Sequence, residues 1–130
     1  MEAMRFWLMA AAASGFLAVA LGAFAAHGLQ GRMSAEQAGW FATGLRYHMF
    51  HVAGLLAVAL LFRSAVGSSL ALTVAGWGFL LGSAVFCGLL YVMALGGARW
   101  LGAVVPLGGL AFLAGWASLF FYAFRRIGTG

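Results

Sequence analysis

Four long apolar runs are the feature that most constrains the fold of this 130-residue chain. A membrane-spanning helix needs about 20 mostly apolar residues, and such runs occupy residues 6–26, 44–62, 70–95 and 100–124. Only 7% of the residues are charged and 65% are hydrophobic, which lies outside the range of soluble globular domains. The sequence therefore predicts an all-α, integral membrane protein with one transmembrane domain over residues 1–130.

The short links between the runs predict how the helices are connected. The segments at residues 63–69 and 96–99 are too short to carry the chain back across the membrane. Neighbouring helices should therefore be antiparallel, in an up-down-up-down four-helix bundle. Both termini then lie on one side of the membrane. The basic residues expected on that side are Arg5, Arg63, Arg125 and Arg126, against Arg32, Arg99 and the borderline Arg46 on the other. Because basic residues favour the cytoplasmic side, we expect cytoplasmic termini.

The longest polar segment lies between the first two runs, at residues 27–43. Ser34 is followed three residues later by Gln37, a capping-box pattern that begins a helix. Trp40 and Phe41 suit a helix in the headgroup zone. We therefore predict a short interfacial helix between the first and second spans, with the alternative that this helix runs on into the second span.

Small residues recur at helical spacing in the runs. Helices in lipid associate through close packing of small side chains, so these stripes predict packing inside the bundle or, as the alternative, a homo-oligomer formed through glycine-rich faces. The stripes are Gly15, Ala18, Gly22 and Ala25; Gly78 and Gly82; and Gly108, Ala111, Gly115 and Ser118. In the fourth run Pro106 predicts a kink, because proline has no backbone N–H to donate.

The stretch LRYHMFH, residues 45–51, places polar side chains at the start of the second run. At 100° per residue, Tyr47, His48 and His51 fall on one face of a helix, whereas Arg46 points elsewhere and can reach lipid phosphates. An imidazole inside a span should face protein. The antiparallel arrangement brings further polar groups to the same membrane end, namely His27, Tyr91 and Arg99.

Several hypotheses fit this predicted polar cluster. Its groups could simply hydrogen-bond between helices. They could instead bind or pass a small or lipid-like ligand, and the residues expected to contact it are His27, Arg46, Tyr47, His51, Tyr91 and Arg99. A metal or haem site using His27, His48 and His51 is the runner-up. A third possibility is an accessory subunit that docks through its glycine stripes.

Other classes of function lack the residues that they need. The net charge of +5 comes from scattered arginines, unlike the clustered basic patch of a nucleic-acid-binding protein. The single cysteine, Cys87, has no partner for a disulfide. No carboxylate pair, nucleophile elbow or phosphate-binding loop is present, so we expect a non-enzymatic protein, and the sequence names no cofactor.

Three stretches together resemble a known family. They are GAFAAHGL (residues 22–29), RYHMFHVAGLL (residues 46–56) and the segment from GLLYVMALGG to AFLAGW (residues 88–116). They are similar to the small bacterial inner-membrane proteins of the domain of unknown function 423 family, the YgdD/YwdK-like proteins. The resemblance implies four transmembrane helices in the inner membrane. It points to His27, Tyr47, His51, Tyr91, Pro106, Gly108 and Gly109 as motif positions, with His48 and Cys87 as departures from the pattern, and it implies no activity.

Overall fold

The computed structural model of the chain describes residues 1–65 and 69–127, and its regular elements in these ranges are all helical. Four helical segments are long and apolar enough to cross a membrane, Glu2–His27, Ala35–Ser64, Leu70–Ala94 and Arg99–Ile127. The prediction of an all-α membrane protein with four spans is confirmed. The elements are α1 (Glu2–His27), α2 (Ala35–Ser64), α3 (Leu70–Gly82), the π-helix η1 (Ser83–Cys87), α4 (Gly88–Ala94), the 3₁₀-helix η2 (Arg99–Ala103) and α5 (Val105–Ile127).

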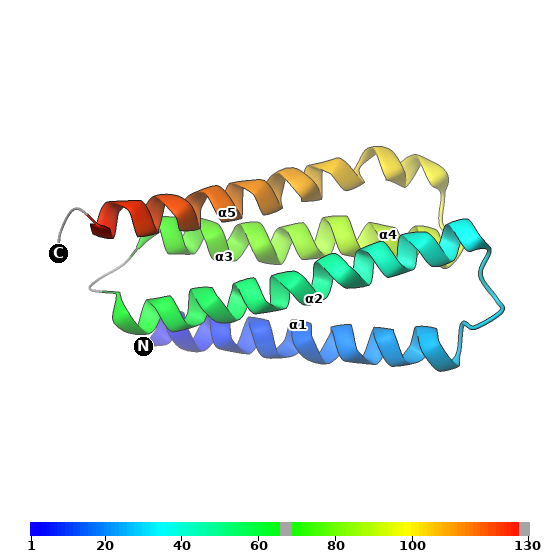
Figure 1. Cartoon of the computed structure of the whole chain (residues 1–130), viewed down its shortest axis with the longest axis horizontal. Coiled ribbons are helices and arrows are strands. Elements are labelled where there is room, and N and C mark those ends of the chain that lie inside the picture. The colour runs from blue at the N-terminus through cyan, green and yellow to red at the C-terminus, as the bar shows by residue number, and fades with distance from the viewer. Residues whose placement is uncertain (66–68, 128–130) are drawn as a thin grey trace.

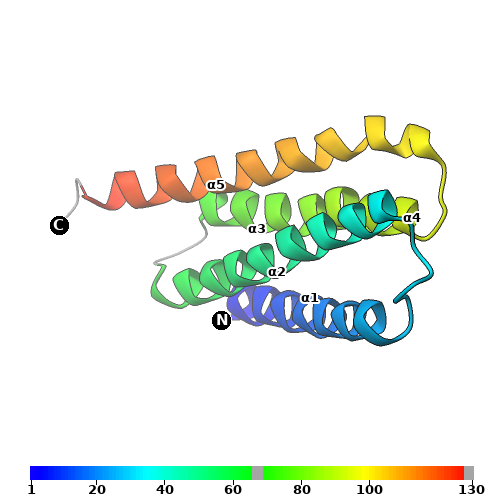
Figure 2. The ribbon, with the colours of Figure 1, turned by 45° about the vertical axis from the view of Figure 1, so that its right-hand side comes forward.

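The spans lie side by side in chain order. Figure 1 and Figure 2 both show consecutive spans running in opposite directions, with α1 and α5 at opposite edges and both chain ends at the same end of the molecule. α1 packs mainly against α2, and α5 packs mainly against α3 and η1. The core therefore lies along α2 and α3, where Leu55, Val58, Leu72 and Phe79 are fully buried.

The second span begins earlier than its apolar run. The predicted capping box is present, since Ser34 Oγ accepts from the backbone N–H of Gln37 and the Ser34 N–H donates to Gln37 Oε1. The helix that starts there continues without interruption to Ser64, so the described residues contain no separate interfacial helix. Gly44 lies inside this continuous helix, and its missing side chain lets α2 approach Tyr91 and the carbonyl of Cys87 closely.

The fourth span is interrupted where a proline kink was expected. η2 ends at Ala103, and Pro106 is the second residue of α5. In the first turn of a helix a proline leaves no intrahelical hydrogen bond unmade. The proline therefore marks the start of a new helix, and the prediction of a kink inside one helix is corrected to a change from 3₁₀- to α-helix.

The glycine stripes pack inside the chain. A Cβ added to Gly78 would lie 2.7 Å from the carbonyl oxygen of Ala111 and 3.0 Å from Gly115 Cα, and one added to Gly15 would lie 3.3 Å from Val52. The absence of a side chain at Gly78 lets α3 and α5 approach each other closely, and Gly15 does the same for α1 and α2. This packing agrees with the interpretation that the stripes hold the bundle together, and self-association stays a prediction.

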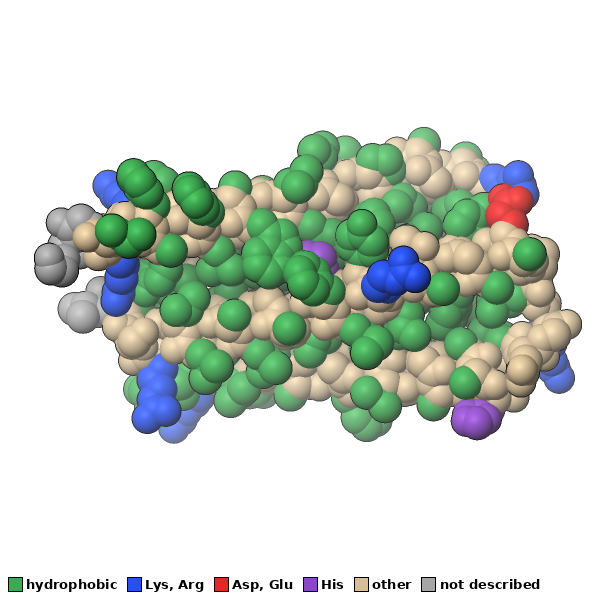
Figure 3. Space-filling view, in the orientation of Figure 1, with side chains coloured by type: hydrophobic (Ala, Val, Ile, Leu, Met, Phe, Trp, Pro, Cys, Tyr) green, Lys and Arg blue, Asp and Glu red, His purple; other side chains and the backbone are tan. Residues whose placement is uncertain are grey.

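Side-chain type separates the long sides of the molecule from its ends. Figure 3 shows hydrophobic side chains spread along the visible long side and most of the visible charged side chains at the two ends. Large apolar side chains such as Phe16, Val19 and Phe120 are more than two-thirds exposed. A surface of this kind suits a lipid environment, in which apolar side chains face acyl chains and arginines reach the interfaces.

Candidate functional site

A hydrogen-bonded chain of three polar side chains crosses the interior from α1 to α4. Ser14 Oγ lies 2.9 Å from His48 Nε2, and His48 Nδ1 lies 2.9 Å from the Tyr91 hydroxyl. His48 is 4% exposed and Tyr91 8%. Both hydroxyl groups can donate or accept, so either tautomer of His48 keeps both bonds. This chain of residues, the His48 triad, joins three helices at one point.

The second histidine of α2 faces another helix and is held more tightly. The indole N–H of Trp116 donates to His51 Nε2 over 3.0 Å, and His51 Nδ1 lies 2.7 Å from the carbonyl oxygen of Tyr47. The imidazole stacks on Phe112 with 3.5 Å between ring centroids and 9° between planes. Both ring nitrogens and one face of the ring are thus occupied, so His51 acts as a structural clasp between α2 and α5.

The His48 triad borders a cavity of about 500 Å³ between α1 and the span formed by α3, η1 and α4. We call it the lateral groove, because Met9 and Leu17 on its rim are 71% and 51% exposed on the surface of the bundle. Its lining is largely apolar. The lining residues are Phe6, Met9, Ala10, Ala13, Ser14, Leu17, His48, Leu80, Ser83, Ala84, Gly88 and Tyr91.

The wall of the lateral groove opposite α1 has an irregular backbone. Residues Ser83–Cys87 form a π-helix between α3 and α4, a geometry that is frequent at functional sites. The Ser83 hydroxyl is buried and has no hydrogen-bond partner in the described parts of the chain. A buried hydroxyl without a partner is costly, so the groove wall retains unused hydrogen-bonding capacity beside the triad.

The His48 triad lies near the middle of its helices, whereas the polar cluster was expected at one membrane end. α1 begins at Glu2 and α2 at Ala35, so Ser14 and His48 each lie more than three helical turns from the start of their helix. At the rise of an α-helix this separation is roughly 18–20 Å along the axis. The expected depth was counted from the start of the apolar run at residue 44, whereas α2 begins at Ala35. Ser14 and His48 therefore lie near the middle of the spans Glu2–His27 and Ala35–Ser64.

The structure separates the other predicted site residues from the triad. His27 is exposed at the end of α1, and Arg46 is exposed on α2. Arg99 is also exposed, where it pairs with Glu36 at 2.9 Å and lies over the Trp40 ring. The six residues predicted to contact a ligand therefore do not form one site. Of these six, only Tyr91 belongs to the His48 triad.

Tyr47 and His51 contact α5, whereas His48 contacts α1 and α4. Tyr47 is 42% exposed, and its ring packs against Phe86 at 4.7 Å. A second cavity, of about 540 Å³, lies between α2 and α5 beside these two residues and Pro106. Its lining is also largely apolar, but His51 has no nitrogen left to offer a ligand there.

The three histidines proposed as metal ligands do not come together. His48 is bonded to Ser14 in the middle of α1, whereas His27 is the last residue of that helix. The two positions on α1 are roughly 20 Å apart along the axis. His51 Nε2 is taken by Trp116. Within residues 1–65 and 69–127, no group of three His, Cys, Asp or Glu side chains could hold a metal ion.

Ser14, Ser83 and Trp116 are the site residues that sequence reasoning missed. Ser14 stands alone in the run AAAASGF, and Trp116 follows a glycine in LAGW. Single polar atoms in the middle of an apolar span usually seek a partner on another helix. That rule could have selected these residues, but it could not have said which partner each one meets.

Comparisons with known proteins identify relatives along nearly the whole chain. The family model described as protein of unknown function (DUF423) matches residues 21–109. The UPF0382 inner membrane protein YgdD of Escherichia coli K12 is 42% identical over 126 residues, covering 93% of this chain and 91% of the relative. The UPF0382 membrane protein YwdK of Bacillus subtilis 168 is 41% identical over 115 residues, covering 87% and 91%.

A third relative extends the same match to the staphylococci. The UPF0382 membrane protein SH2409 of Staphylococcus haemolyticus is 35% identical over 125 residues, covering 96% of this chain and all of the relative. No solved structure shows a significant match to this chain. The family expected from GAFAAHGL, RYHMFHVAGLL and the segment at residues 88–116 is confirmed, and the chain belongs to this uncharacterised DUF423 (UPF0382) family of membrane proteins.

Proposed function

We propose that the protein binds a neutral, lipid-soluble molecule in the lateral groove, with the polar group of that molecule hydrogen-bonded to the His48 triad. The observation that carries this proposal is the position of an apolar cavity directly beside three linked polar side chains, Ser14, His48 and Tyr91. Ligand sites in proteins are typically apolar cavities with a few convergent polar groups. The role that we propose is binding, without catalysis.

The depth of the triad selects the class of ligand. Phospholipid headgroups stay at the interfaces of the bilayer, whereas Ser14 and His48 lie about 18–20 Å from the starts of their helices. A ligand that places a hydrogen-bonding group there must itself dissolve in the hydrocarbon core. A ring ketone or an alcohol on an apolar skeleton meets this condition, but a charged headgroup does not, because the described groove lining contains no arginine or glutamate.

The chemistry of the triad suits such a group. A carbonyl oxygen needs a donor and a hydroxyl needs both a donor and an acceptor. The hydroxyls of Ser14 and Tyr91 can supply either role because the His48 imidazole can exchange its tautomer between them. The unpartnered hydroxyl of Ser83 in the same wall adds a further donor.

The test is to identify what the protein retains when it is extracted in mild detergent. Gly88 lines the groove, and a Cβ added there would meet nothing within 4 Å, so Gly88→Leu should fill the groove without disturbing packing. We expect mass spectrometry of organic extracts to find a neutral lipid-soluble molecule with the wild type, reduced at least about tenfold in Gly88→Leu.

The matched control is Gly39→Leu, since a Cβ at Gly39 also meets nothing within 4 Å and this residue does not line the groove. It should retain the molecule at the wild-type level. Extracts that are the same for wild type and Gly88→Leu, with both proteins folded, would overturn the proposal.

A second candidate function follows from the order of the groups in the triad. A nucleophile bonded to a base that is oriented by a third group is the arrangement of acyl-transfer enzymes, and Ser14, His48 and Tyr91 stand in that order. It ranks second because Ser14 lies inside the regular helix α1, where backbone N–H groups are engaged in the helix. Labelling of Ser14 by a fluorophosphonate, absent in Ser14→Ala, would favour it, and lack of labelling would exclude a reactive serine.

We also propose that the protein lies in the bacterial inner membrane with both termini in the cytoplasm. Its Escherichia coli relative is named an inner membrane protein, and four of the seven arginines lie toward the end that carries both termini, at Arg5, Arg63, Arg125 and Arg126. A reporter fused to the C-terminus, fluorescent only in the cytoplasm, should therefore be bright. A dark fusion that is stably inserted would reverse the orientation.

A further inference from the structure

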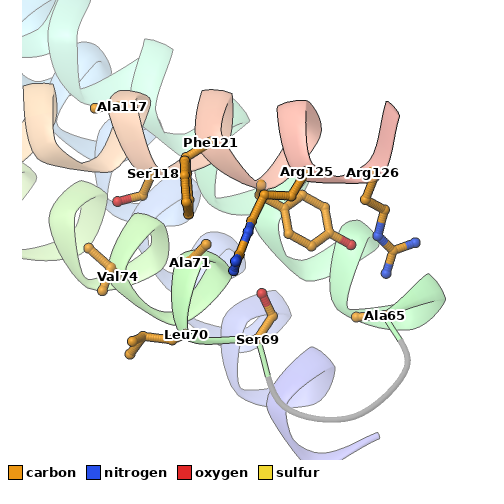
Figure 4. A pocket seen from close by; sticks show the side chains of 11 residues that line it. Ala65, Ser69, Leu70, Ala71, Val74, Ala117, Ser118, Phe121, Arg125 and Arg126 are labelled. Carbon is orange, nitrogen blue, oxygen red and sulfur yellow. The ribbon is translucent and has the colours of Figure 1, made fainter. Parts of the chain in front are cut away.

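A further cavity lies at the end of the molecule that carries both termini, far from the His48 triad. It measures about 620 Å³ and lies between the beginning of α3 and the last turns of α5. Figure 4 shows side chains from both helices around it, with Arg125 reaching from α5 in the direction of Ser69 and Ala71. We propose that this terminal cavity binds the phosphate headgroup of an anionic phospholipid.

The charge of the cavity favours an anion. Arg125 and Arg126 both line it and form part of the last turn of α5. The Arg125 guanidinium lies 5.1 Å from the centre of the Phe121 ring, and that of Arg126 lies 5.0 Å from the centre of the Tyr122 ring. In Figure 4 the Arg125 side chain extends toward the α3 wall, while Arg126 lies at the edge of the cavity beside Ala65. The described lining contains no acidic residue. Glu36 is paired with Arg99 toward the opposite end, and Glu2, at the start of α1, is not part of the lining.

Neutral polar groups add hydrogen-bonding capacity on both walls. The Tyr122 hydroxyl is buried and has no hydrogen-bond partner in the described residues, although the residue lines the cavity. On the opposite wall the α3 helix begins after Ser69, whose Oγ accepts from the backbone N–H of Leu72. The start of a helix carries partial positive charge, so α3 adds to the field of the two arginines.

The apolar part of the lining distinguishes a lipid from free phosphate. Leu70, Val74 and Phe121 line the cavity and are 79%, 40% and 51% exposed on the lipid-facing surface. A phosphate group near Arg125 would place its attached acyl chains along these three side chains. An inorganic phosphate would leave that apolar wall uncovered, so the lining matches an amphiphile.

The membrane setting supplies such a ligand at this depth. The two arginines lie at the end of a spanning helix, where headgroups are found. Basic cavities between transmembrane helices on the cytoplasmic side bind anionic headgroups. The inference rests on the proposed orientation only for the choice of leaflet, and it does not depend on the ligand proposed for the lateral groove.

The test uses the full chain in detergent with three probes at equal concentration. These are short-chain phosphatidylglycerol, short-chain phosphatidylcholine and inorganic phosphate, each read by native mass spectrometry and by the shift in melting temperature. We expect phosphatidylglycerol to bind and to raise the melting temperature, and the other two probes to have little effect. A direct hydrogen bond between an arginine and a phosphate contributes about 1 kcal/mol or more, roughly fivefold in affinity, so Arg125→Gln/Arg126→Gln should lose about 25-fold.

The matched control is Arg5→Gln/Arg63→Gln, which removes two charges toward the same end but outside the described lining. Its affinity for phosphatidylglycerol should stay within about threefold of the wild-type affinity, far less than the 25-fold loss expected for Arg125→Gln/Arg126→Gln. Equal losses in the two double variants would overturn the inference, because they would show a diffuse charge effect. Equal binding of phosphatidylglycerol and phosphatidylcholine, or binding of inorganic phosphate alone, would overturn the inference as well.

Discussion

Trp116 donates its indole N–H to His51 Nε2 over 3.0 Å, and this bond decides the protonation of the ring. An indole nitrogen can only donate, so Nε2 must accept. The proton therefore sits on Nδ1, which donates to the carbonyl oxygen of Tyr47 at 2.7 Å. A neutral imidazole with both nitrogens satisfied is the form that a low-dielectric interior stabilises.

The first prediction concerns this tautomer. Nitrogen-15 NMR of histidine-labelled protein should show His51 as the neutral Nδ1–H form, because both of its partners have fixed roles. His48 should show an averaged signal, since Ser14 and Tyr91 accept either arrangement. Assignment through His51→Gln and His48→Gln would identify the signals. A His51 proton on Nε2 would contradict the hydrogen bond from Trp116.

The second prediction tests the contribution of that bond to stability. Trp116→Phe leaves His51 Nε2 as a buried acceptor without its donor, which should lower the free energy of unfolding by about 1 kcal/mol. The measurement is unfolding in mixed micelles of detergent and sodium dodecyl sulfate. Trp100→Phe is the control, since Trp100 is 68% exposed, and it should change stability little. Equal effects of the two substitutions would show that the indole hydrogen bond contributes nothing.

Hydropathy predicted the spans well where the helix and its apolar run coincide. The third run, residues 70–95, matches the observed segment Leu70–Ala94. The second helix begins well before its run because the capping box at Ser34 and Gln37 starts it in the polar segment. Hydropathy reports which part of a helix suits lipid, whereas hydrogen bonding and capping decide where the helix begins.

The site was harder to predict because a helical face does not name its neighbour. His48 and His51 differ by only about 60° around α2, yet His48 meets Ser14 and Tyr91 while His51 meets Trp116. The sequence pattern placed both rings on one face correctly. It could not show that one edge of this face contacts α1 and α4 while the other edge contacts α5. Those contacts depend on how α1 and α5 pack against α2.

The third prediction concerns the His48 triad as a link between helices. Tyr91→Phe removes the hydroxyl bonded to His48 Nδ1, so stability should fall by about 1 kcal/mol. Tyr47→Phe is a matched control, because the Tyr47 ring is 42% exposed and its hydroxyl has no hydrogen bond within the described residues. Melting temperatures in detergent provide the comparison. A larger loss for Tyr47→Phe than for Tyr91→Phe would contradict the buried hydrogen bond.

The fourth prediction concerns the ion pair between Glu36 and Arg99. Their side chains are 53% and 77% exposed, and exposed pairs contribute about 0–1 kcal/mol. Glu36→Gln should therefore change the free energy of unfolding by less than about 1 kcal/mol, and added salt should remove most of the difference. Arg32→Gln, which removes an exposed arginine outside this pair, serves as the control. A loss that persists at high salt would show that the pair is part of a buried contact.

The fifth prediction uses two adjacent glycines of α5 that differ only in what they face. A Cβ on Gly108 would overlap the backbone nitrogen of Phe86 in η1, and backbone cannot move aside as a side chain can. Gly108→Ala should therefore push α5 away from η1 and lower the free energy of unfolding by about 2–3 kcal/mol. A Cβ on Gly109 would meet only the Phe86 ring, at 3.9 Å.

Gly109→Ala should thus be neutral or slightly stabilising, since alanine favours a helix more than glycine does. The two glycines are neighbours in the same helix and receive the same substitution. A difference in melting temperature between the two variants therefore reports the close contact between α5 and η1. Equal stability of the two variants would show that α5 can shift relative to η1 without loss, and the packing of the π-helix against α5 would then not hold the fourth span in place.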